Sequence, residues 1–272
     1  MRILKPTIGK HDGSSFRELL DMWKENGYCE VIDNTDLQPS DLEETLRVES
    51  RPWVNEVGSI LLYDNPIADK LHDSLTWDMA LFANEVPFLK NCYAWTFWPK
   101  HPKAHEEVTR EAPLPQYNDR PVKSCFFGTF TTNMRGLSDW STVIEKFWMG
   151  QCDSRLLNPK EYLNVLKNSK FGLCLAGVGP KCLRDMELIG MGTVPVFTNG
   201  VSTEYYNRLE KDRHFLYGES PEEVAHVIAE CSQDKWEYMS KECLRWYEEN
   251  ASPKGSYELT RRIIEENGGS IH

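Results

Sequence analysis

The residues with the clearest chemical potential lie in one segment, KFGLCLAGVGPKCLRDMELIGMGTVPVFTNG, at positions 170–200. An apolar run opens it, the turn Gly-Val-Gly-Pro follows at 177–180, and a helix-forming run then carries Arg184 and Glu187. A helix N-terminus offers free N–H groups and partial positive charge, which suit a phosphate. Arg184 falls near the first helical turn, where the helix dipole disfavours a cation unless an anion is present.

Two interpretations of this pair are open on spacing alone. Residues three apart share one helix face, so Arg184 and Glu187 could form an ordinary surface ion pair. Alternatively, the guanidinium could bind a diphosphate while the carboxylate accepts hydrogen bonds from the two hydroxyls of a ribose. The second arrangement is what a sugar nucleotide requires.

A second loop, GTFTTNMRG at 128–136, follows another buried apolar run. The backbone N–H groups of Gly128 and Thr129 would face the same ligand, and Arg135 could reach its diphosphate. Arg135 is equally compatible with a solvated loop. Tyr217 closes a short apolar run and could stack on a base, although an aromatic residue in this position is more often part of a core.

Residues 169–200 resemble the nucleotide-sugar-binding segment of exostosin-like glycosyltransferases. That segment has an apolar strand, a glycine-containing loop, Arg-x-x-Glu on a helix and a Pro-Val strand that ends in a polar-Asn-Gly turn. The residues in register with it are Arg184, Glu187, Gly192, Pro195, Val196, Asn199 and Gly200. The chain departs from it in LAGVG, where the family often has a Pro-Arg-Gly turn, so one expected phosphate-binding arginine is missing. The resemblance covers about half of the chain and none of its first hundred residues.

The resemblance implies an α/β fold with two Rossmann-like domains facing a cleft, of the GT-B type. The C-terminal half would bind a nucleotide sugar, most simply a UDP-sugar, and the N-terminal half a glycan acceptor. The donor-binding residues carried by these motifs are Arg184, Glu187, Arg135, Gly128, Thr129, Gly177, Val178, Gly179 and Tyr217. The chain is similar to short exostosin-like transferases of bacteria and large algal viruses, which implies a cytoplasmic enzyme, in the host cytoplasm if viral, and possible use of UDP-xylose.

A base that deprotonates the acceptor hydroxyl should come from a carboxylate or histidine at a strand end in the N-terminal half. The candidates are His11, Asp12, Asp64, Asp73 and Asp78, of which one is expected to act. Each could equally be a cap or a solvated residue. Because no second covalent nucleophile is evident, we expect inversion by one in-line displacement.

Metal chemistry and other cofactors are not expected. The chain has no Asp-x-Asp motif, and the matches Asp41-x-Glu43 and Asp185-x-Glu187 fall in apparent helices. His101 and His105, spaced i,i+4 before Glu106, could hold a metal on a helix, but they lie in a proline-spaced stretch that reads as a solvated connector.

Composition narrows the functional class further. The net charge is -11 over 272 residues, which argues against a nucleic-acid or membrane-surface partner. The eight cysteines form no C-x-x-C pair, so a reducing compartment is expected. No run is long enough to be a signal peptide core or a membrane span.

The periodicity predicts strands and helices in two successive α/β rhythms. We expect helices at 16–26, 36–49 (with Ser40 as cap), 66–86 and 137–151, with 98–121 connecting the halves. The predicted domains are 1–105 for the acceptor and 106–250 for the donor. A C-terminal helix at 251–272 would pack back on the first domain.

Three other functions remain to be separated from this one. A fucosyltransferase-like enzyme using GDP-fucose shares part of the motif, and a nucleotide-sugar-binding or glycan-binding module would bind without turnover. A Rossmann dehydrogenase or methyltransferase is disfavoured, because TIGKHDGSSF after the first apolar run is not G-x-G-x-x-G.

Overall fold

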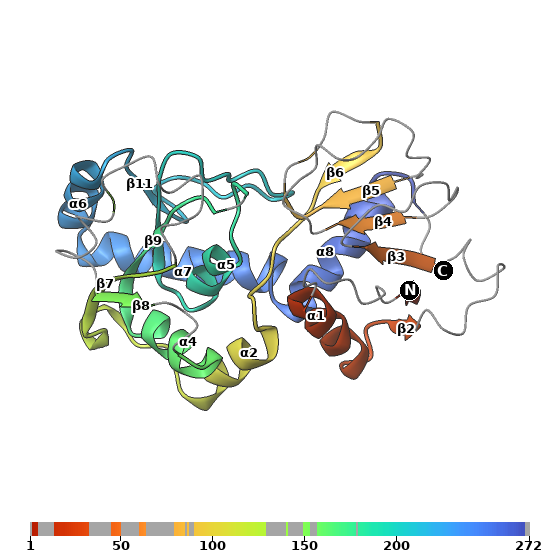
Figure 1. Ribbon diagram of the computed structural model, residues 1–272, viewed down its shortest axis with the longest axis horizontal. Coiled ribbons are helices and arrows are strands. Elements are labelled where there is room, and N and C mark those ends of the chain that lie inside the picture. Colours follow the sequence, from red (N-terminus) through yellow and green to blue (C-terminus); the bar gives the residue numbers. More distant parts are fainter. Residues whose placement is uncertain are drawn as a thin grey trace. The chain divides into compact units, whose positions relative to one another are not determined.

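The computed structural model describes residues 2–4, 14–32, 45–49, 60–63, 79–84, 86, 90–128, 140, 149–152, 157–177 and 179–269. The chain divides into two compact units, and each contains one parallel sheet with helices (Figure 1). The first unit comprises Met1–Trp98, Glu204–Asn207 and Glu249–His272. The second comprises Pro99–Thr203 and Arg208–Glu248.

The first unit contains six parallel strands in the order β2-β1-β3-β4-β5-β6. Its elements are β1 (Arg2–Leu4), α1 (Ser14–Glu25), β2 (Glu30–Ile32), β3 (Thr45–Glu49), β4 (Ile60–Tyr63), β5 (Met79–Phe82), β6 (Cys92–Ala94) and α8 (Pro253–Glu266). Helix α8 begins at the cap Ser252, whose side chain accepts from the N–H of Gly255. It packs against α1, so the last helix of the chain completes the first unit (Figure 1).

Three tryptophans contribute to the core of this first unit. Trp23, Trp95 and Trp98 are fully buried. Their indole N–H groups donate to the hydroxyls of Ser256 (3.3 Å), Thr260 (2.8 Å) and Ser15 (3.2 Å), respectively. A buried indole needs such a partner, and here each finds it between elements far apart in the sequence.

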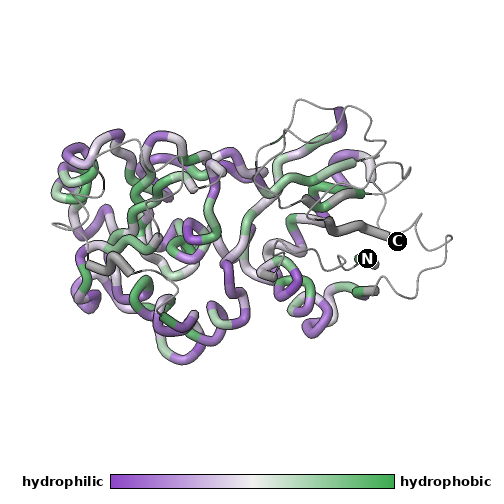
Figure 2. The backbone as a smooth tube through the Cα atoms, viewed as in Figure 1, coloured by the Kyte–Doolittle hydropathy of each residue, from purple (hydrophilic) through white to green (hydrophobic). Residues whose placement is uncertain are grey.

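The second unit contains five parallel strands in the order β11-β10-β9-β7-β8. Its elements are α2 (Pro102–Glu111), the 3₁₀ turn η4 (Tyr117–Asp119), β7 (Val122–Phe127), β8 (Met149–Cys152), α4 (Pro159–Lys167), β9 (Ser169–Cys174), α5 (Leu183–Gly190), β10 (Val194–Phe197), β11 (Leu216–Tyr217), α6 (Pro221–Glu230) and α7 (Gln233–Asn250). The described residues of β9 and β10 are almost all buried, as expected of strands covered on both faces, and Figure 2 shows the hydrophobic colour along the strands of this unit.

The strand order of the second unit reverses between β7 and β9. The first strand of this sheet, β7, has β8 on one side, and the chain then crosses to the other side to build β9, β10 and β11. Open parallel sheets bind ligands beyond the carboxyl ends of their strands, at such a reversal. The residues that follow β7 and β9 are therefore placed where a ligand is expected.

Three predicted helices are corrected in their C-terminal parts. The predicted helices 36–49, 66–86 and 137–151 include residues of the strands β3, β5 and β8. Most of their other residues lie outside the described part of the chain. For β5, the run Met-Ala-Leu-Phe is buried throughout, and an apolar run this short has no period that separates a strand from a helix. The predicted cap Ser40 lies outside the described residues.

The stretch 98–121 is also more ordered than a connector. It forms the helix α2, and Lys167 of α4 closes the C-terminal end of that helix by donating to the carbonyls of Val108 and Ala112, both at 2.8 Å. His105 on this helix is 1% exposed, so the expectation of a solvated segment is wrong.

Candidate functional site

The candidate site lies at the carboxyl ends of β7 and β9. Gly128 follows β7 directly, and Gly177 and Gly179 lie in the turn after β9. These two strands are neighbours in the sheet, so the two predicted glycine turns are brought to one edge. Within the second turn, the N–H of Gly177 donates to the carbonyl of Gly179 at 3.0 Å.

Arg184 joins the two strands at this edge. Its Nη1 donates to the carbonyl of Phe127, the last residue of β7, and its Nη2 to that of Leu175, just after β9, at 3.3 Å. The guanidinium also lies 5.0 Å from the centre of the Phe126 ring. Arg184 is only 9% exposed, and within the described part of the chain its Nε–H has no hydrogen-bond acceptor. A buried cation is thus placed at the strand reversal with a donor still available.

Arg120 is a second buried arginine of the same unit, and its hydrogen bonds differ from those of Arg184. Arg120, 2% exposed, donates to the carbonyls of Pro115 (3.0 Å), Ser169 (2.8 Å) and Met191 (2.9 Å) and to the hydroxyl of Thr193 (2.8 Å). It lies at the amino ends of β7 and β9, the opposite edge from Arg184. Each of its side-chain nitrogens has an acceptor within the unit, and four of its five N–H donors are used.

Glu187 is buried one helical turn after Arg184, and its partners are internal. The Tyr162 hydroxyl donates to one carboxylate oxygen at 2.7 Å, and the backbone N–H of Lys100 donates to the other at 3.0 Å. Glu187 is 2% exposed, and burial raises the pKa of its carboxyl, while these two hydrogen bonds oppose that rise. A surface ion pair between Arg184 and Glu187 is therefore the wrong interpretation, because both side chains are buried and each is held by other groups.

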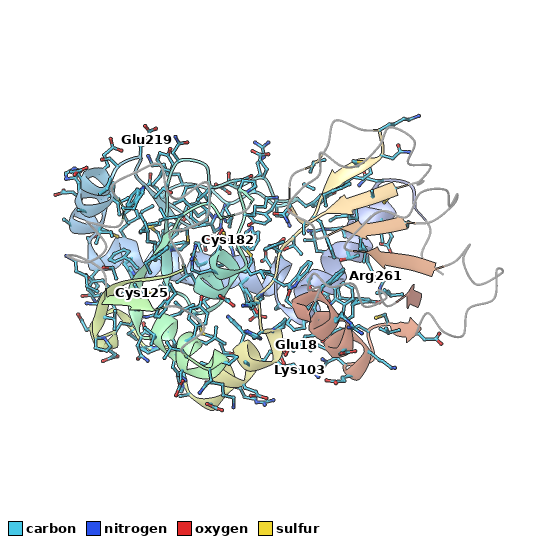
Figure 3. The ribbon with its side chains drawn as sticks, in the orientation of Figure 1. Glu18, Lys103, Cys125, Cys182, Glu219 and Arg261 are labelled. Carbon is cyan, nitrogen blue, oxygen red and sulfur yellow. The ribbon has the colours of Figure 1, made fainter. Side chains whose placement is uncertain are left out.

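The start of α5 is fixed by its own side chains. Asp185 accepts from the N–H of the cap residue Cys182, which Figure 3 labels, at 3.0 Å, and this bond places a carboxylate at the positive end of the helix. The turn before it is tied to the loop after β10, because Ser202 donates its N–H to the Pro180 carbonyl at 2.8 Å. Thr198, at the end of β10, donates to the Cys174 carbonyl at 3.1 Å. The sequence pattern gave no sign of either cross-link.

Gly192 serves the turn between α5 and β10. Its φ of +62° lies in the left-handed region, and a Cβ there would come within 2.9 Å of the Ser240 hydroxyl. The same hydroxyl donates to the Gly192 carbonyl at 2.6 Å. This glycine of the motif is accordingly explained by backbone geometry and close packing.

Tyr217 lies at the end of β11, opposite Phe197 of β10. It is half-buried, with its hydroxyl 3.4 Å from Glu219 and the Lys211 ammonium 5.7 Å from its ring centre. The remaining predicted site residues lie outside the described part of the chain. These are the donor candidates Thr129, Arg135 and Val178 and the base candidates His11, Asp12, Asp64, Asp73 and Asp78.

The described residues offer no metal centre. No group of three or more His, Cys, Asp or Glu side chains among them is arranged to hold a metal ion. His105 packs its ring against that of Tyr247, with centroids 4.9 Å apart, and its Nδ1 lies 3.2 Å from the Tyr247 hydroxyl. Its other neighbour is Gly190, where an added Cβ would lie 2.5 Å from the imidazole. Within the described ranges, no helix is long and apolar enough to cross a bilayer.

The burial of His105 predicts an acid-sensitive fold. Burial lowers the pKa of His105 from 6.5 to about 4, so the folded state binds this proton less readily than the unfolded state. Its stabilising contribution is complete above pH 6.5 and is lost as the pH falls through about 4, an effect of about 3 kcal/mol. Burial lowers the pKa of His214 to about 4 as well. We expect His105→Gln to remove about half of the decrease in unfolding free energy between these pH values, measured by urea denaturation. The same substitution at exposed His226 should leave the slope unchanged, and an equal slope in all three proteins would refute the assignment.

The two-unit fold is that of solved glycosyltransferases. A glycosyltransferase from Rickettsia africae ESF-5 aligns over 98% of this chain and 97% of its own, with a TM-score of 0.54 and 11% identity. HepE from Anabaena, solved in complex with UDP and glucose, aligns over 98% of this chain and all of its own, with a TM-score of 0.50 and 7% identity. The HepE complex with UDP-glucose gives a TM-score of 0.50 and 8% identity.

Comparison of the sequence with protein families and curated proteins found no match. The predicted fold class, α/β with two Rossmann-like domains of the GT-B type, is confirmed by the two parallel sheets and by the solved structures. The exostosin-like resemblance stays a prediction.

Proposed function

We propose that this chain is a glycosyltransferase that transfers a sugar from a nucleoside diphosphate, UDP in the first instance, to a hydroxyl of a glycan. The observation that carries the proposal is Arg184. In a GT-B fold, it places a buried guanidinium at the strand reversal of the second sheet, and among the described residues its Nε–H has no acceptor. A diphosphate supplies an acceptor for this N–H and a strong negative charge beside the guanidinium. HepE, which shares the fold, is solved with UDP-glucose.

Each donor group then has a proposed role. Arg184 binds the diphosphate, with Arg135 beside it and with backbone N–H groups from the turns at Gly128, Thr129, Val178 and Gly179. Tyr217 stacks on the base. Glu187 accepts from the ribose hydroxyls on the lone pairs that Tyr162 and Lys100 leave unused, since a carboxylate has about four acceptor positions.

The reaction we propose is a single in-line displacement with inversion. A carboxylate or histidine of the first unit, from the group His11, Asp12, Asp64, Asp73 and Asp78, takes the proton of the acceptor hydroxyl. The acceptor oxygen attacks the anomeric carbon, and the bond to the diphosphate breaks with its electron pair on the β-phosphate oxygen. Arg184 stabilises that charge, so no metal ion is required. The finer parts of the proposal are an exostosin-like ancestry, a pentose donor such as UDP-xylose and a cytoplasmic location.

A thermal-shift panel tests the proposal. We expect UDP to raise the melting temperature, because a ligand at a hundred times its Kd stabilises the folded state by about 2.7 kcal/mol. UDP-glucose, UDP-xylose, GDP, GDP-fucose and inorganic phosphate complete the panel, each with and without EDTA. Stabilisation by no nucleotide would overturn the proposal, and stabilisation by GDP alone would replace it with the GDP-fucose alternative. If UDP no longer stabilises the protein in EDTA, metal independence is overturned. If a UDP-sugar binds but no UDP is released from it with any acceptor, the chain is a binding module.

A further inference from the structure

Tyr162, which is outside the predicted site, contacts two elements that position Arg184. These are β7, whose last carbonyl accepts from Arg184, and α5, which carries Arg184. Tyr162 lies on α4, whose first turn is fixed by a capping box in which the Asn158 side chain accepts from the Glu161 N–H and the Glu161 carboxylate from the Asn158 N–H. Leu163 and Leu166 bury the helix against the unit, so the Tyr162 side chain has a fixed origin. Tyr162 itself is 8% exposed.

The ring of Tyr162 contacts the end of β7. It meets the Phe127 ring edge to face, with centroids 5.1 Å apart and an interplanar angle of 83°. Phe127 is also the residue whose carbonyl accepts from Arg184. The ring thus supports one of the two carbonyls that orient the guanidinium.

The hydroxyl of Tyr162 contacts α5. It donates to Glu187 at 2.7 Å, a charge-assisted bond inside the unit, and Glu187 lies one helical turn from Arg184. Burial raises the pKa of Tyr162 well above its usual range, so at neutral pH the hydroxyl keeps its proton and remains the donor.

We propose that Tyr162 is a positioning residue of the donor site: by holding Phe127 and Glu187 together, it keeps the Arg184 guanidinium where a diphosphate binds. The inference rests on the proposed function. It assigns Tyr162 no contact with the ligand. Its effect passes through Arg184 and must therefore depend on the phosphates of the ligand.

The test is Tyr162→Phe, which keeps the ring contact and removes only the hydroxyl. Affinities for UDP and for uridine are measured by calorimetry at a temperature where the variant is folded. We expect UDP binding to weaken about tenfold, which is about 1.4 kcal/mol, and uridine binding to change less than twofold, because only UDP carries the phosphates that Arg184 binds. The ratio of the two affinities is the readout, since a general loss of stability would not alter it.

The matched control is Tyr117→Phe. Tyr117 is another tyrosine of the same unit, partly buried against Trp236 with ring centroids 5.4 Å apart, and it precedes β7, whereas Phe127 ends that strand. This control should leave the UDP-to-uridine ratio unchanged. An unchanged ratio in Tyr162→Phe, or an equal change in both variants, would refute the inference.

A double-mutant cycle tests the route through Glu187. In a Glu187→Met background the acceptor is gone, so Tyr162→Phe should change the ratio by less than twofold. If Glu187→Met does not fold, Glu187→Gln replaces it, and the effect of Tyr162→Phe should then be smaller than in the unmodified chain. Any contact of Glu187 with ribose affects UDP and uridine alike and cancels in the ratio. If the unmodified chain binds no nucleotide, both the proposed function and the inference are refuted. If it binds UDP but the effects of the Tyr162 and Glu187 substitutions on the ratio are fully additive, only the inference is refuted.

Discussion

Replacing Arg184 by alanine is expected to weaken UDP binding at least thirtyfold, roughly the 2 kcal/mol of a charge-assisted contact with phosphate. The side chain is the buried cation at the reversal of β7 and β9, and its Nε–H has no described acceptor. Its two other bonds go to carbonyl oxygens, which do not neutralise its charge. Calorimetry with UDP measures the loss, and the thermal shift caused by UDP should disappear in parallel.

The variant also leaves the buried carbonyls of Phe127 and Leu175 without their hydrogen-bond donor, so its melting temperature should fall. Affinity must therefore be measured well below the transition. Arg184→Lys is the matched variant: it keeps a point charge but loses the fork of parallel donors, and its affinity should lie between the other two. If Arg184→Ala binds UDP as tightly as the unmodified chain, Arg184 is not the diphosphate contact and the central observation behind the proposed function is lost.

The donor side could be predicted from the sequence because its signal is local. An apolar strand, a glycine turn and Arg184 in the first turn of a helix follow each other without interruption, and the parallel pairing of β7 with β9 then brings Gly128 to the same edge.

The surroundings of Glu187 could not be predicted in this way. Tyr162 and Lys100 lie 25 and 87 residues away in the sequence, and nothing in either segment indicates that it donates to a carboxylate. Short strands in the first unit were missed for a related reason. A central strand of a parallel sheet is apolar on both faces, so β5 carries no alternation, and it becomes recognisable only through its pairing with β4 and β6.

Arg120→Met is expected to destabilise the second unit by about 3–5 kcal/mol while leaving the UDP affinity of the folded protein unchanged. Arg120 joins the segment before η4, the start of β9 and the turn between α5 and β10 through bonds to Pro115, Ser169 and Met191. Burial lowers its pKa to about 10, so the group is still cationic at neutral pH, and it lies 4.9 Å from the centre of the Trp236 ring. Methionine fills similar space but leaves these buried carbonyls without a donor.

Urea denaturation of the variant measures this loss, and exposed Arg261 supplies the control. Arg261 pairs with Glu265 at 2.9 Å on the surface of α8, with both side chains about half exposed, so Arg261→Met should cost less than about 0.5 kcal/mol. The stability loss of Arg120→Lys should lie between those of Arg120→Met and Arg261→Met. An ammonium has three donors, whereas the guanidinium makes four hydrogen bonds here. The contrast with Arg184 decides the matter: Arg120→Met must affect stability and spare UDP affinity, whereas Arg184→Ala must remove UDP affinity. If both substitutions reduce affinity by the same factor, the two arginines do not differ in the way their hydrogen bonds indicate, and the loss reflects the unfolding of the unit in each case.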